Sequence, residues 1–139
     1  IYPGNSMEAF HAALNAGYSG FELDIRVSKD KKFIVTHDEK LDVATSCVGN
    51  VSEYDLAELE KCSIVASTFI PEINAIRSPV AAQMVSLKKV FQEFSQNPSL
   101  EYLVVDTKIN SDDQLSIAYQ EAIEPFLSNP EFLKKILCP

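Results

Sequence analysis

Apolar and polar residues alternate over two stretches of the chain, and this period of two predicts β-strands. In residues 21–27, the run Phe-Glu-Leu-Asp-Ile-Arg-Val places apolar side chains on one face and charged ones on the other. Residues 102–108 alternate in the same way, with Asp106 and Lys108 on the more polar face. Residues 33–36 form a third, shorter β-rich run that ends at His37.

Apolar residues recur at helical spacing elsewhere, next to residues that commonly begin or end helices. The predicted helices are Ser6–Ala16 with Asn5 or Ser6 as N-cap and Gly17 after its end, Ser52–Lys61 capped by Ser52, Ser86–Ser95 capped by Ser86, Gln114–Leu127, and a last stub after Pro130. Residues 41–51 read as a loop, and residues 62–80 show no clean period. Helices between strands favour an α/β fold with parallel pairing.

Length and charge narrow the possible classes of protein. A chain of 139 residues forms one compact domain, about half of the ~250 residues of a complete (β/α)₈ barrel. The net charge of −8, with no basic face, argues against a nucleic-acid partner. No apolar run approaches the ~18 residues that span a bilayer, so we expect no membrane span. The chain starts at Ile1 without an initiator Met, so we expect it to be a piece of something longer.

The cysteines predict free thiols. Cys47, Cys62 and Cys138 are odd in number and widely spaced, and they form no Cys-x-x-Cys motif. Three free thiols weakly favour a cytoplasmic, reducing location, although a removed signal peptide would leave no trace in this sequence. Cys47 follows His37 by ten residues, and we interpret it as structural or incidental.

Candidate chemistry gathers at the strand ends. Glu22 and Asp24 lie two residues apart on one strand face, as do Asp106 and Lys108 on another, and His37 ends the short run. Each pattern alone is more typical of a solvated surface. Together they lie where barrel enzymes carry their catalytic groups, so we expect these side chains to meet.

The types of residue in this group indicate a metal and a phosphate ester. Three carboxylates that converge repel one another unless a cation neutralises them, and oxygen ligands suit Ca²⁺ or Mg²⁺ better than Zn²⁺. His37 can transfer a proton near neutral pH, and Lys108 can hold an anion. A cation, a lysine and a histidine together suit a phosphate ester.

The order of these motifs resembles the glycerophosphodiester phosphodiesterase family over about residues 3–108. The residues that carry the resemblance are Pro3-Gly4-Asn5-Ser6, Ala9-Phe10, Ala16-Gly17-Tyr18-Ser19-Gly20, Phe21-Glu22-Leu23-Asp24-Ile25, Ser28-Lys29-Asp30, Thr36-His37-Asp38, Leu41-Asp42 with Thr45, Val51-Ser52, Leu56-Ala57-Glu58-Leu59, Val85-Ser86-Leu87-Lys88-Lys89-Val90 and Val104-Val105-Asp106-Thr107-Lys108. The resemblance implies a partial TIM (β/α)₈ barrel of the PLC-like phosphodiesterase type. We expect a single partial domain over residues 1–139, with a variable insertion at about residues 62–85.

The resemblance also implies a role for each candidate residue. Glu22, Asp24 and Asp106 match metal ligands, Asp106 in place of the family's usual Glu, while His37 matches one of two catalytic histidines and Lys108 the lysine near the phosphate. The implied cofactor is a divalent cation, Ca²⁺ or Mg²⁺. The implied reaction is hydrolysis of a small-molecule glycerophosphodiester to an alcohol and glycerol 3-phosphate.

Two departures from the family pattern keep alternatives open. Gly4 stands where the family has a Glu, and the family's His-Arg-Gly motif, which holds its other catalytic histidine, precedes the residues present here. We therefore expect residues 1–139 to be inactive alone and, as an open half-barrel, poorly stable. The alternatives are a non-catalytic relative that binds a phosphate ester or a protein, and a phospholipase-type enzyme that forms a cyclic phosphate.

Overall fold

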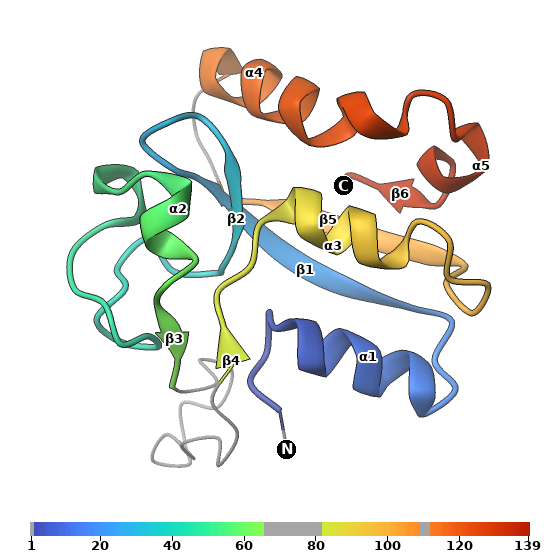
Figure 1. Ribbon diagram of the computed structural model, residues 1–139, viewed down its shortest axis with the longest axis horizontal. Coiled ribbons are helices and arrows are strands. Elements are labelled where there is room, and N and C mark those ends of the chain that lie inside the picture. Colours follow the sequence, from blue (N-terminus) through green and yellow to red (C-terminus); the bar gives the residue numbers. More distant parts are fainter. Residues whose placement is uncertain (1, 66–81, 109–111) are drawn as a thin grey trace.

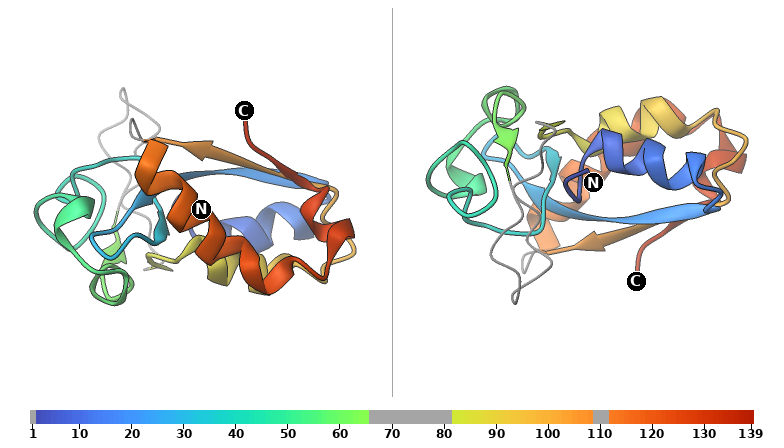
Figure 2. Two further views of the ribbon diagram at one scale, coloured as in Figure 1. Left: turned by 90° about the horizontal axis from the view of Figure 1, so that it is seen from above. Right: turned by 90° about the horizontal axis from the view of Figure 1, so that it is seen from below.

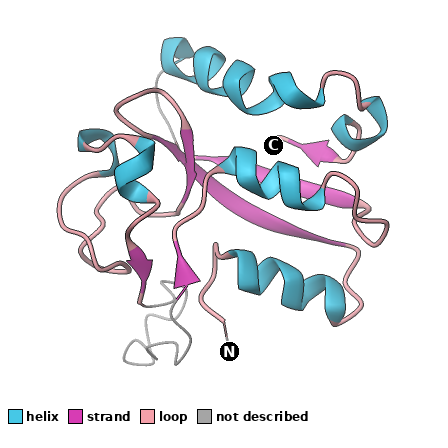
Figure 3. Cartoon of the chain, viewed as in Figure 1, coloured by secondary structure: helices cyan, strands magenta, loops and turns pink. Residues whose placement is uncertain are grey.

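The computed structural model describes residues 2–65, 82–108 and 112–139, and it is an α/β fold (Figures 1 and 3). In chain order the elements are α1 (Met7–Asn15), β1 (Gly20–Val27), β2 (Phe33–Val35), the 3₁₀ turn η1 (Val51–Glu53), α2 (Leu56–Leu59), β3 (Ser63–Ile64), β4 (Ala82–Gln83), α3 (Leu87–Phe94), β5 (Tyr102–Thr107), α4 (Asp112–Ile123), η2 (Glu124–Phe126), α5 (Pro130–Leu133) and β6 (Ile136–Leu137). No helix among these residues is both long and apolar enough to cross a bilayer.

The main sheet has the strand order β2-β1-β5-β6. β1 and β5 are parallel and aligned so that Asp24 stands opposite Asp106, and β6 continues the parallel arrangement beside β5. β2 is antiparallel to β1, because the polar turn at residues 28–32 is too short for a parallel connection. The predicted parallel pairing therefore holds for β1 and β5 but not for β2, and β6 is a further parallel strand that the sequence did not predict.

Helices cover one face of this sheet and leave the other face to polar side chains. In Figure 2 the helices α1, α3 and α4 lie on the same side of β1 and β5. The apolar side chains of both strands point toward these helices and are buried, among them Leu23, Ile25 and Leu103. The alternation in the sequence thus sorts the strand residues as predicted, and the charged residues of β1 lie on the opposite face.

Helix boundaries follow the predicted caps in some places and depart from them in others. The Ser6 and Ser86 hydroxyls accept hydrogen bonds from the first turns of α1 and α3. The predicted helix Ser52–Lys61 is confirmed only for α2 (Leu56–Leu59): Tyr54 is extended and separates η1 from α2, and the N-cap is Asp55 in place of the predicted Ser52. Most of the predicted insertion at residues 62–85 lies outside the described residues, and its flanking strands β3 and β4 pair antiparallel.

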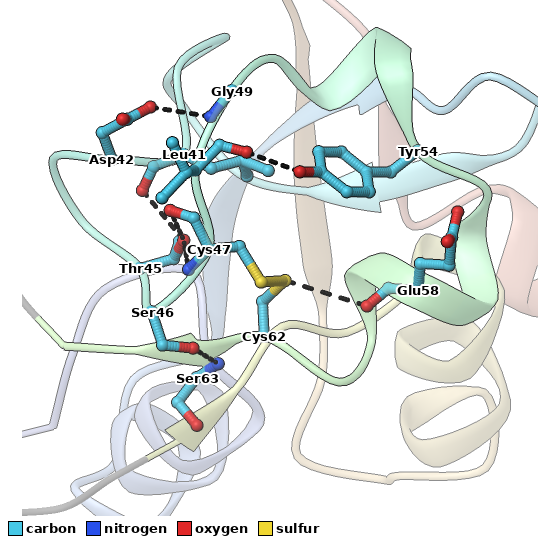
Figure 4. The surroundings of a disulfide bond; sticks show 11 residues. Leu41, Asp42, Thr45, Ser46, Cys47, Gly49, Tyr54, Glu58, Cys62 and Ser63 are labelled. Atoms are coloured by element: carbon cyan, nitrogen blue, oxygen red, sulfur yellow. Dashed lines mark hydrogen bonds between the residues drawn. A yellow bond between two sulfur atoms is a disulfide. The ribbon is translucent and has the colours of Figure 1, made fainter.

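The prediction of three free thiols is wrong, because Cys47 and Cys62 form a disulfide (Figure 4). An antiparallel bridge between Thr45 and Ile64 brings the two cysteines together across 15 residues of chain. Only Cys138, which is exposed, is a free thiol among the described residues. The disulfide removes the ground for expecting a reducing, cytoplasmic location.

The disulfide belongs to a second, smaller core beside β2. This core is built by residues of β2 and the loop after it, of η1 and α2, and of the β3–β4 pair and its flanks: Ile34, Leu41, Val51, Leu59, Cys62, Ile64, Ala82 and Met84. The main core lies between the sheet and α1, α3 and α4. The segment of residues 38–65, which begins directly after His37, therefore packs with β4 and with Ile34 of β2 as a second module beside the main core.

Candidate active site

Three carboxylates meet on the polar face of the sheet. Glu22 and Asp24 project from β1 and Asp106 from the neighbouring position on β5, so one oxygen of each lies within 4.8 Å of the others. Asp24 is buried, with 8% of its surface exposed, whereas Glu22 is exposed. Asp106 reaches this group although its side chain is one methylene shorter than that of Glu.

Asn5 holds the buried carboxylate in place. Its amide nitrogen donates to Asp24 Oδ2 at 2.9 Å, and its amide oxygen accepts from the Asp24 backbone N–H at 3.1 Å. Asn5 has a φ of 56°, in the left-handed region that Asn tolerates better than most residues. The sequence indicated Asn5 as a helix cap and as part of the Pro3–Ser6 motif, but not this contact, because the two residues are 19 positions apart.

Lys108 provides a positive charge beside the carboxylates. Its Nζ lies 2.5 Å from Asp106 Oδ2 and 3.4 Å from Asp24 Oδ1. The hydrogen bond to Asp106, helped by the bond and charge of Asp24 and opposed by desolvation, raises the pKa of Lys108 above its usual value. Lys108 is therefore protonated at neutral pH and offsets part of the negative charge of the group.

His37 reaches the same region by a different route from the acids. It follows β2, and the N–H of the preceding residue, Thr36, donates to the Asp24 carbonyl at 2.9 Å. The antiparallel return of β2, rather than a parallel strand end, thus brings His37 alongside β1. Its Nδ1 lies 2.8 Å from Asp38 Oδ1, and 42% of its side chain is exposed.

Arg26, the next polar residue on the same face of β1, also belongs to this region. Its guanidinium donates to the main-chain carbonyls of His37 and Lys108. Sequence reasoning assigned Arg26 only to the polar face of a strand. Its signal is the i, i+2, i+4 spacing from Glu22 and Asp24, which places all three on one face.

The acidic group could hold a metal ion. All three donors are carboxylate oxygens, with no Cys or His among them, and such a donor set suits a hard divalent cation. Asn5 occupies one oxygen of Asp24, which leaves Oδ1 on the side of Lys108. The group therefore combines a held carboxylate, two further acids and a nearby ammonium in one small volume.

Fold and site together define a class of protein: an α/β barrel type in which acids on adjacent parallel strands converge, with Asp24 opposite Asp106. Residues 1–128 match the model of the glycerophosphoryl diester phosphodiesterase family, and the chain belongs to this family. It is 35% identical over 100 residues to a glycerophosphodiester phosphodiesterase of Bacillus altitudinis. The aligned region covers 72% of this chain and 40% of that relative.

Solved structures agree on the fold. The glycerophosphoryl diester phosphodiesterase domain of an uncharacterized protein from Mycobacterium tuberculosis superposes with a TM-score of 0.74 at 18% identity, covering 99% of this chain and 47% of that one. An Oleispira antarctica phosphodiesterase in complex with the product sn-glycerol-3-phosphate gives 0.67 at 19% identity, covering 88% and 47%. The expected partial TIM barrel is thereby confirmed, and the chain spans less than half the length of these relatives.

Proposed function

We propose that the protein carrying these residues hydrolyses glycerophosphodiesters to an alcohol and glycerol 3-phosphate with the help of a divalent cation. The observation that carries the proposal is the convergence of Glu22, Asp24 and Asp106 within 4.8 Å, beside Lys108 and near His37. The relative from Bacillus altitudinis is named for this activity, and the Oleispira antarctica phosphodiesterase was solved with sn-glycerol-3-phosphate. Residues 1–139 are, in this proposal, part of one barrel domain with an insertion at about residues 62–85.

Glu22, Asp24 and Asp106 would hold the cation, which we propose to be Ca²⁺ or Mg²⁺. When bound, such a cation withdraws charge from a phosphate oxygen and makes the phosphorus easier to attack. Asn5 keeps Asp24 directed into the group by holding its Oδ2 and its backbone N–H. Lys108 binds the negative phosphate and limits the repulsion between substrate and acids.

His37 is the residue that moves a proton in this scheme. Asp38 accepts from Nδ1–H, and in this proposal Nε2 exchanges a proton with substrate or water. In the overall reaction a water oxygen bonds to phosphorus and the bond from phosphorus to the alcohol oxygen breaks. One water proton ends on that oxygen, and the products are the alcohol and glycerol 3-phosphate.

The test follows glycerophosphoethanolamine by ³¹P NMR, using the longest natural chain that contains residues 1–139. We expect glycerol 3-phosphate to form, its formation to stop with EDTA, and Ca²⁺ or Mg²⁺ to restore it. Glu22→Gln and His37→Asn should each lower kcat/KM by at least about 100-fold. Lys134→Gln is the control, because Lys134 pairs with Glu131 on the exposed surface of α5 and its end.

The same spectra separate the remaining alternatives. A persistent cyclic phosphate signal in place of the phosphomonoester would identify a phospholipase-type enzyme and contradict hydrolysis to glycerol 3-phosphate. A folded protein that binds the diester but forms no product with either Ca²⁺ or Mg²⁺ would indicate a non-catalytic binding barrel. Equal rates for wild type and His37→Asn would remove His37 from the mechanism.

A further inference from the structure

Arg26 lies between the two main-chain segments that carry the proposed proton-transfer and phosphate-binding residues. It is on β1, which has β2 on one side and β5 on the other. Its backbone stands opposite Ile34 of β2, and its side chain is only 20% exposed. A charged side chain this far buried requires partners for its donors, and the structure supplies them.

The guanidinium makes three short contacts in two directions. Nε donates to the His37 carbonyl at 2.7 Å. Nη1 donates to the Lys108 carbonyl at 3.0 Å and to Glu39 Oε2, also at 3.0 Å. His37 and Lys108 come from different segments of the chain, and these bonds tie both main chains to the same planar group.

Glu39 fixes the guanidinium from the side of the disulfide-linked module. Its Oε2 pairs with Arg26, and its Oε1 accepts from the Ser52 hydroxyl at 2.9 Å at the start of η1. The Glu39 carbonyl also accepts from the Val51 N–H at 2.9 Å. The orientation of Arg26 is therefore set by the segment that begins immediately after His37.

We propose that Arg26 is a positioning residue of the active site, which holds the backbones of His37 and Lys108 in register with the carboxylates on β1 and β5. The effect of Arg26 on catalysis rests on the proposed function, whereas its effect on the backbones of His37 and Lys108 rests on the three hydrogen bonds. Its hydrogen bonds among the described residues go to His37, Glu39 and Lys108, so in this proposal Arg26 acts through His37 and Lys108.

A guanidinium suits this task better than an ammonium. It is planar and presents donors in fixed directions, so the atoms that reach the two carbonyls are rigidly related. A lysine at position 26 keeps the charge but offers donors from one atom at the end of a flexible chain. Because misplacement of a reacting group by about 1 Å can cost about 100-fold in rate, the loss of this rigidity should be measurable.

The test compares Arg26→Lys and Arg26→Gln with wild type in the longest natural chain that contains residues 1–139. We expect kcat for glycerophosphoethanolamine to fall about 10- to 100-fold in both variants, while the Kd for Ca²⁺ changes less than about threefold. Lys32→Gln is the matched control. It removes the ion pair with Asp30 from the same β1–β2 hairpin and contacts neither carbonyl.

A second readout needs neither substrate nor metal. Within residues 1–139 the histidines are His11 and His37. His11 lies on α1, which covers the helix-bearing face of the sheet, and it pairs with Glu93 of α3. In ¹H–¹⁵N imidazole spectra, both variants should shift or broaden the signals of His37, assigned with His37→Asn, and leave those of His11 at their wild-type positions. A merely structural role would move both or neither.

Wild-type kcat and an unmoved His37 signal in a folded Arg26→Lys variant would overturn the proposal, and so would a fall in kcat with His37 unmoved. If Arg26→Gln does not fold by circular dichroism, Arg26→Lys decides alone. If wild type itself does not hydrolyse the diester, the proposed function fails, and the imidazole spectra still decide whether Arg26 positions His37.

Discussion

At the scale of single residues, the site depends on side chains that hold the acids as well as on the acids themselves. Asn5 is the clearest example, because both ends of its amide contact Asp24. Loss of a group that orients a metal ligand typically weakens metal affinity about 10- to 100-fold. The geometry of the acidic group is thus set partly by a residue in the turn before α1.

We predict that Asn5→Gly weakens the binding of Ca²⁺ or Mg²⁺ by about 10- to 100-fold without unfolding the protein. Glycine is the suitable replacement, because it adopts the positive φ of Asn5 without strain and Ser6 remains the helix cap. Isothermal titration calorimetry measures the affinity. Asn15→Ala, at the exposed end of α1, is the control and should bind as wild type does.

Sequence reasoning at this scale found the residues whose chemistry stands out, and it missed those that act through geometry. Glu22, Asp24 and Asp106 could be found because strand alternation fixes the face on which they lie. Asn5 and Arg26 could not be assigned their contacts, because these depend on hydrogen bonds between segments distant in sequence.

At the scale of secondary-structure elements, Asp30 joins the β1–β2 turn to α2. Its Oδ1 accepts from the Ser28 hydroxyl at 2.7 Å and from the Leu56 N–H at 2.8 Å, and Lys32 lies 3.2 Å from Oδ2. Burial by itself would raise the pKa of Asp30. The bonds from Ser28, Leu56 and Lys32 outweigh it, so the net pKa is lowered.

A lowered pKa in the folded state means that the ionised Asp30 stabilises the fold above its ordinary pKa, and that this stability is lost as the pH falls through the lowered value. We predict that Asp30→Asn costs about 1 kcal/mol of unfolding free energy at pH 7. The difference from wild type should shrink below about pH 4. Urea unfolding at several pH values measures it. Glu101→Gln, an exposed change, should show no such pH-dependent difference.

The disulfide stabilises the second module, whose hydrophobic core is small. The loop that begins at Leu41 is tied to β3 by the bonds Ser46 N–H to Ser63 carbonyl and Val65 N–H to Ala44 carbonyl, both 2.8 Å. Figure 4 shows Cys47 and Cys62 joined among these residues. A core of this size commonly needs a covalent link to hold its loops together.

We predict that reduction of the disulfide destabilises this module by about 2–4 kcal/mol, because a loop of about 15 residues regains its freedom in the unfolded state. Hydrogen exchange by mass spectrometry should show faster exchange in peptides spanning residues 41–51 and 60–65, with β1 and β5 still protected. Cys138→Ser is the control for thiol effects. Unchanged exchange in the module after complete reduction would contradict the prediction.

Elements with a long periodic pattern could be predicted, and short ones could not. β1, β5, α1 and α3 each carry several apolar residues at the right spacing, and two of the helices begin at a capping serine. β3, β4 and β6 have two residues each, too few for any period to show. The disulfide was missed because its partners meet only through pairing of the loop with β3.

At the scale of the whole molecule, the sheet separates two functions. Helices α1, α3 and α4 cover one face of the sheet, which holds the main core (Figure 2). The alternation along β1 and β5 places the acids, Lys108 and Arg26 on the opposite face. This arrangement could be predicted as a partial barrel because the order of the strand motifs is that of the family. The antiparallel pairing of β2 with β1 could not be predicted, because the alternation of apolar and polar residues does not show whether a neighbouring strand is parallel or antiparallel.

The separation leads to a last prediction, on the stability of the whole molecule. Three carboxylates within 4.8 Å, in a chain of net charge −8, repel one another, and Lys108 compensates only part of that charge. A cation that binds only the folded protein adds about 2.7 kcal/mol at 100 times its Kd. For a chain of this size we expect Tm to rise by roughly 5–15 °C when millimolar Ca²⁺ or Mg²⁺ is added. In Glu22→Gln the rise in Tm should be at least halved, and the fold should remain intact because the side chain of Glu22 is exposed. Na⁺ at equal ionic strength should shift the Tm of both proteins alike. Differential scanning fluorimetry measures Tm. If the divalent ions raise the Tm of wild type and of Glu22→Gln equally, a specific site is contradicted and the effect is general screening of the acidic surface.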